Sequence, residues 1–217
     1  MDITAVLQAF VKNSSDRANL AATRAGSLLT TPYGLPYSRW VAEGKGFSVI
    51  EATATAGVAA LPTTTAGLTI QNGEPDNGKW YVVHSVFAEC EASAAAVETA
   101  HIAHCVGMNR VAAATQDLAL TSVKPQLAGS GPYAGLAILD LAATVVDDLW
   151  KPVGTHASTA VASNGEFALR YLLDGLVIVK PKAQYSLELI ATSTGVTGRL
   201  GQTHGYQYPK TSAGLAA

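Results

Sequence analysis

The sequence predicts a mainly β fold, a jelly-roll-like sandwich of two β-sheets that follows a short N-terminal helix and an extended arm. Three observations lead to this prediction. From Gly46 onward, short runs rich in Val, Ile, Thr, Tyr and Phe alternate with turn residues at the spacing of sandwich strands. Almost no helical periodicity separates these runs, which argues against a doubly wound α/β fold. The sequence shows no internal repeat of the kind that would predict a propeller.

The chain has 217 residues, which fit one main domain with appendages. We expect the N-terminal helix and the extended arm in residues 1–45. The β-sandwich is expected in residues 46–210, and a flexible C-terminal tail in residues 211–217.

The first segment has apolar residues at helical spacing. They are Ile3, Val6, Leu7 and Phe10. A helix of about three turns is marginal alone in water, so this apolar stripe must dock on something. Its own domain, a neighbouring subunit and a larger assembly all remain open.

Residues 13–46 show no sustained period of either kind and contain several prolines and glycines. Long segments of this sort are uncommon inside compact domains, so an extended arm across a surface is expected. The side chains that would anchor it are Tyr33, Leu35, Tyr37 and Trp40.

Eight runs are expected as strands: 47–53, 68–71, 79–89, 98–106, 167–173, 176–180, 184–192 and 199–208. Turn formers fill residues 71–78 and predict a loop. Asp174-Gly175 stands between two apolar runs and predicts a hairpin over 167–180. Residues 112–161 are hard to interpret, and 136–150 fits either a helix or two strands.

Apolar residues also recur with a period of two in the run 79–89. Trp80, Val82, Val86 and Ala88 are expected on one face of that strand, with His84 interrupting the face.

The content of charged residues indicates which kinds of partner the chain is expected to contact. Charged residues make up 14% of the chain, against about a quarter in ordinary soluble proteins. So little solvating surface favours contact with copies of the chain or with another protein. The net charge of −2 and pI near 6.2 speak against nucleic acid.

The sequence offers little that would attach the protein to a membrane or export it. No apolar run reaches the roughly 18 residues of a membrane span, and no basic N-terminal region precedes an apolar block and a cleavage site. A cytosolic protein with two reduced, buried cysteines, Cys90 and Cys105, is therefore expected.

One cluster contains metal-capable side chains, namely His101, His104 and Cys105, with His84 or Cys90 as a further ligand. On a strand, His101 and His104 point to opposite faces, so their ligand atoms do not converge. We expect no metal site there and no cofactor.

Other motifs give no catalytic residue. Residues 129–131 lack the nucleophile elbow, and 195–198 lack a phosphate-binding spacing. The acidic pairs Asp147-Asp148 and Glu89 with Glu91 are more typical of solvated groups than of a general acid and base. Tyr133, Trp150, Tyr206 and Tyr208 suit a sugar platform or, preferably, an oligomer interface.

Local features of the chain resemble small structural proteins of tailed-phage virions, most closely the head decoration (cement) proteins. The features are residues 42–47 entering the first strand, 77–80 at the end of the loop, and 179–181 followed by 185–187. The resemblance implies a jelly-roll subunit, commonly a trimer, made in the host cytoplasm and bound to the major capsid protein outside a phage head. No catalytic residue is implied.

In that interpretation the assembly contacts are Ile3, Val6, Leu7, Phe10, Tyr33, Tyr37 and Trp40. The main alternative is a glycan- or receptor-binding jelly-roll module of a fibre or tail. A cupin-like metal enzyme and a major shell protein are lesser alternatives.

Overall fold

The computed structural model describes residues 21–22, 28–29, 36–92, 98–107, 115–145, 149–158, 167–192 and 195–207. The predicted helix over residues 1–13 and the predicted tail over 211–217 lie outside these ranges. Two short strands, β1 (Ala21–Ala22) and β2 (Leu28–Leu29), pair with each other ahead of the main domain.

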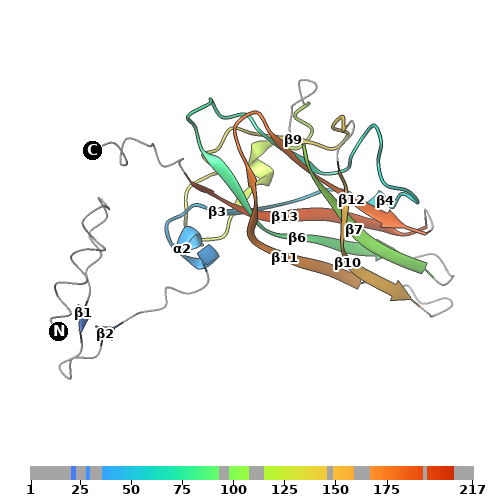
Figure 1. Ribbon diagram of the computed structural model, residues 1–217, viewed down its shortest axis with the longest axis horizontal. Coiled ribbons are helices and arrows are strands. Elements are labelled where there is room, and N and C mark those ends of the chain that lie inside the picture. The colour runs from blue at the N-terminus through green and yellow to red at the C-terminus, as the bar shows by residue number, and fades with distance from the viewer. Residues whose placement is uncertain are drawn as a thin grey trace.

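Two antiparallel sheets form the main domain (Figure 1). One sheet has the order β10-β7-β12-β5-β9, and its strands are β5 (Thr69–Asn72), β7 (Glu98–Gly107), β9 (Ala137–Asp140), β10 (Lys151–Ser158) and β12 (Gln184–Ala191). The other has the order β11-β6-β13-β3-β8, and its strands are β3 (Gly46–Ile50), β6 (Trp80–Ala92), β8 (Lys124–Pro125), β11 (Phe167–Val179) and β13 (Thr197–Gln207). Strand β4 (Thr55–Ala56) also pairs with β13.

The strand order is that of a jelly roll, as the sequence predicted. The set β3-β13-β6-β11 faces the set β5-β12-β7-β10, so the chain crosses between the sheets at nearly every connection. The connection from β7 to β10 adds one strand to each sheet, β8 beside β3 and β9 beside β5.

Alternating side chains from both sheets fill the core. Its largest fully buried members include Tyr81, Tyr185, Phe47 and Leu68. At one end the rings of Phe47, Tyr81 and Tyr133 lie around His204, which is completely buried, and Tyr206 stacks on Phe47.

The predicted arm ends in a helix rather than in extended chain. Helix α2 (Pro36–Ala42) lies against β3 and β13 (Figure 1). Proline suits the first turn of a helix because its missing N–H needs no partner there. Trp40 lies so close to Gly205 that a Cβ at Gly205 would be 2.6 Å from the indole ring. Gly44, at φ 67°, ends the helix by donating its N–H to the Val41 carbonyl oxygen.

The hairpin predicted at Asp174-Gly175 is wrong. Residues 167–172 and 177–179 both pair with β6 in one direction, so β11 is one strand interrupted by a bulge. Asp174 and Gly175 have the positive φ values of 47° and 83° that such dipeptides favour, but they bulge out of the strand instead of reversing it. Strand β6 is long enough to pair with both halves, and this pairing buries Leu173 and Val177 in the core.

A second bulge changes the faces of β6. Its register to β13 shifts at the position of His84. Before the shift, Tyr81 and Val83 face the core, and after it Val86 and Ala88 do. Trp80 and Val82 therefore do not share a face with Val86 and Ala88, as the unbroken alternation had predicted.

Other expectations are confirmed. A loop joins β5 to β6, held where the Asn72 side-chain amide donates to the carbonyl oxygens of Lys79 and Val179. Within residues 136–150, the structure has strand β9 and β10 begins at Lys151, while residues 146–148 lie outside the described ranges.

Candidate functional site

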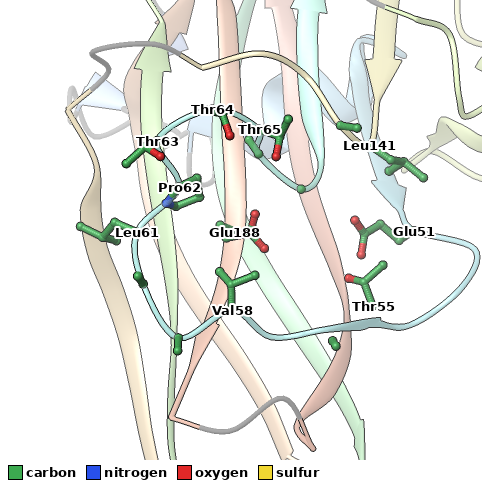
Figure 2. Close-up of a pocket in the computed structure, with 16 residues that line it drawn as sticks. Glu51, Thr55, Val58, Leu61, Pro62, Thr63, Thr64, Thr65, Leu141 and Glu188 are labelled. Carbon is green, nitrogen blue, oxygen red and sulfur yellow. The ribbon is translucent and has the colours of Figure 1, made fainter.

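A pocket of about 600 Å³ opens on the outer face of the β5-containing sheet. The loop from Glu51 to Gly67 runs around it, and Figure 2 shows the Glu51 and Glu188 carboxylates pointing toward each other across the space. Thr55, Val58 and Leu141 are among the other side chains that line it.

Strand β12 explains how Glu188 reaches this position. Its neighbours Leu187 and Leu189 face the core between the sheets, so Glu188 must face outward. The loop is held beside β12, where Val58 donates its N–H to the Leu189 carbonyl oxygen and accepts from the Ala191 N–H, both at 2.9 Å. Further along the loop, Ala66 packs with Ile190 on the outer face. Glu51 follows the end of β3 and lies at the side of the pocket.

Both carboxyl groups are nearly inaccessible to solvent, with Glu51 2% and Glu188 8% exposed. Burial raises the pKa of each to about 7, because it disfavours the charged form. The charge of Glu188 raises the pKa of Glu51 further, whereas the Leu200 N–H, 2.9 Å from Glu51 Oε2, lowers it. Both carboxyl groups therefore change their protonation state near neutral pH.

Two neighbouring buried carboxyl groups favour a state in which one is protonated and the other is charged, because two adjacent charges repel. Among the described residues, no group of three or more His, Cys, Asp or Glu side chains is placed to hold a metal ion.

Sequence reasoning missed this pair. The one signal was Glu188 itself, an acid in a strand whose alternate residues are apolar. The sequence alternates between two sets of residues and so predicts one apolar and one mixed face: Tyr185, Leu187, Leu189 and Ala191 against Ser186, Glu188, Ile190 and Thr192. In the structure, however, all eight residues of β12 are buried. The loop that covers the mixed face is far away in sequence, so local patterning does not show it.

The metal-capable side chains His101, His104 and Cys105 lie on different faces of β7. Cys105 packs with Ala103 and Ile190 in a small cluster on the outer face of β7, the face that His101 also shares. His104 points to the core side, where its Nδ1 lies 3.0 Å from the Tyr185 hydroxyl. The opposite facing of His101 and His104 is as predicted. Cys90 and Cys105 are buried and unbridged, and they lie in different sheets.

Of the four aromatic residues considered for a sugar platform, the three that the structure describes do not form one. Tyr206 stacks on Phe47 with ring centroids 5.6 Å apart, and Tyr133 meets the same ring edge-on at 4.9 Å, at the margin of the core. Trp150 is buried in the cluster on the other sheet. Tyr208 lies outside the described residues.

Two of the predicted assembly contacts lie on α2 and touch the chain's own sheet. Tyr37 donates its hydroxyl to the Phe47 carbonyl oxygen at 3.1 Å and stacks on His84 with centroids 4.1 Å apart. His84 in turn lies 3.5 Å from the Asp174 carboxylate at the bulge of β11. The other assembly contacts, Ile3, Val6, Leu7, Phe10 and Tyr33, lie outside the described residues.

In the described part of the chain, no helix combines the length and the apolar character needed to span a bilayer. Comparison of the chain with protein-family models, with curated proteins and with solved structures found no match.

Proposed function

We propose that the chain is a non-enzymatic structural subunit that associates with copies of itself and, as a small ring such as a trimer, binds the outside of a phage head and stabilises it. The order of a polar arm followed by a jelly-roll sandwich supports the proposal, as does the low content of charged residues.

The observation that carries the proposal is the apolar surface of β11, which forms an edge of its sheet. Four large apolar side chains on it are exposed: Tyr171 (41%), Leu172 (52%), Leu176 (87%) and Ile178 (40%). An edge strand also presents a row of unpaired backbone N–H and C=O groups. A long edge of this kind is a surface for association.

A second copy of this chain is the partner that fits the edge. In a ring of copies, the apolar side chains of β11 in each subunit pack against a different surface of the next subunit, because pairing of β11 with itself would close as a dimer. Burial of the apolar side chains then supplies the driving force.

The stabilising action needs no chemistry. A subunit that binds the assembled shell and not its separate parts shifts the equilibrium toward the shell by mass action.

Light scattering on the chromatographed protein tests the association. The wild type is expected to have the mass of a trimer or another small ring. The double variant Leu172→Asp, Leu176→Asp is expected to be monomeric. A matched control, Leu136→Asp with Leu149→Asp, changes two leucines that are also exposed but lie away from β11, and it should keep the wild-type mass.

Co-sedimentation with empty phage heads tests the second half of the proposal. The wild type should pellet with the heads, and the monomeric variant should pellet less. A wild type that is monomeric at every concentration and stays in the supernatant would refute the proposal.

A further inference from the structure

A second hollow, of about 420 Å³, crosses the outer face of the sheet that contains β11. We call it the outer groove. It is distinct from the pocket at Glu51 and Glu188, which lies on the other sheet. The polar and aromatic side chains that line it are Ser48, Phe87, Glu89, Gln126, Arg170 and Thr203.

The Phe87 ring lies over the neighbouring strand β13. Gly201 faces the ring, and a Cβ at this position would be 2.4 Å from two ring carbons. The absence of a side chain at Gly201 therefore lets the ring cover the backbone of β13. Phe87 remains partly exposed, so it offers the groove an aromatic surface.

Groups of both charges border this ring. Arg170 is directly opposite Phe87 in the pairing of β11 with β6, so the two side chains share a face. Glu89 is two residues further along β6 on the same face. Both are exposed, and neither belongs to an ion pair within the described ranges.

Neutral polar groups complete the lining and are held in place. Gln126 Nε2 donates to Ser48 Oγ at 2.7 Å. Thr203 Oγ1 lies 2.6 Å from Ser85 Oγ, so its hydroxyl is fixed by a buried partner. The groove thus combines hydroxyl, amide, guanidinium and carboxylate groups around one ring.

We propose that the outer groove binds a neutral oligosaccharide. The apolar C–H face of a pyranose packs on an aromatic ring, while planar side chains such as Arg, Glu and Gln pair with its neighbouring hydroxyl groups. Glu89 beside Arg170 disfavours a phosphate or another anion, because the carboxylate opposes the negative charge. This proposal does not rest on the structural role proposed above, since every residue belongs to one chain.

A printed array of neutral oligosaccharides tests the proposal, with the wild type and three variants applied at equal concentration. Phe87→Ala removes the ring, and Arg170→Gln removes the guanidinium. Lys151→Gln is the control, because it removes one exposed cation from the other sheet. We expect the wild type to bind at least one glycan, the first two variants to bind it about tenfold or more weakly, and the control to bind it like the wild type.

Thermal unfolding of each variant shows whether it is folded. If Phe87→Ala is unfolded, the glycan binding of Arg170→Gln alone tests the proposal. An array on which the wild type binds no glycan overturns the proposal. Equal binding by the wild type and Arg170→Gln also overturns it, as does equal loss in Lys151→Gln. Loss of self-association in the β11 variants, without loss of glycan binding, would leave this proposal standing and bear only on the structural role.

Discussion

Replacing Glu51 by Gln should stabilise the protein in alkaline solution and leave it almost unchanged in mild acid. The carboxyl group of Glu51 is buried, and burial raises its pKa from 4.5 to about 7. A shift of this size corresponds to about 3 kcal/mol of stability, since each pKa unit is worth about 1.4 kcal/mol. Glutamine has nearly the same shape and its carbonyl oxygen can still accept from the Leu200 N–H.

The direction of the pH dependence follows from the linkage between proton binding and folding. The folded protein holds the Glu51 proton more tightly than the unfolded chain, so this group's contribution is fully present below pH 4.5 and is lost as the pH rises through about 7. At pH 9 the wild type therefore carries a buried charge that the variant lacks. The amide N–H₂ of the variant needs partners of its own, so we expect a gain of about 1–3 kcal/mol at pH 9.

Urea unfolding at pH 5 and pH 9 measures this difference. Glu188→Gln should behave in the same way, because burial also raises its pKa to about 7. The two gains should not add fully, since Glu188 contributes to the pKa shift of Glu51. Glu89→Gln is the control, because it makes the same replacement at an exposed position. Equal stabilities of wild type and Glu51→Gln at pH 9 would show that the carboxylate is solvated there and would refute the reasoning.

Three further predictions concern single side chains. His204 is fully buried, neither of its ring nitrogens has a hydrogen-bond partner among the described residues, and burial lowers its pKa from 6.5 to about 4. Its contribution to stability should therefore fall as the pH drops from 6.5 to 4, and thermal melting should show that His204→Phe loses less stability over that range than the wild type. Gly175→Ala places a side chain at φ 83° and should destabilise by about 1 kcal/mol in urea unfolding, whereas an alanine at exposed Leu176 should have little effect. Gly205→Ala should displace Trp40, because its Cβ would lie 2.6 Å from the indole, and the tryptophan emission should move to longer wavelength; unchanged emission would contradict the packing of α2.

Periodicity in the sequence was sufficient to predict the sandwich. The run 184–192 alternates so regularly that β12 and its core-facing leucines could be placed in advance. Strand β9 and strand β10 were harder, because the residues around them carry both helical and strand patterns. The helix α2 was missed, although Tyr37, Trp40 and Val41 have helical spacing, because Pro and Gly nearby suggested an extended arm.

The remaining differences come from contacts distant in sequence. Asp174-Gly175 is a strong local turn signal, but its backbone preference serves a bulge equally well, and only the length of β6 decides between them. The burial of Glu188 depends on a loop more than a hundred residues earlier in the chain. The groove around Phe87 likewise depends on Gly201 in a strand paired by the fold.

The unequal edges of the sandwich give the proposed self-association a direction. On one side the sheets end in β8, which has 2 residues including Pro125, and β9, which has 4. On the other side they end in β10 and β11, which have 8 and 13 residues. Short strands and proline discourage strand addition. A molecule that can extend its sheets on one flank alone cannot propagate them into a fibre, so growth by edge pairing stops at a small, closed assembly.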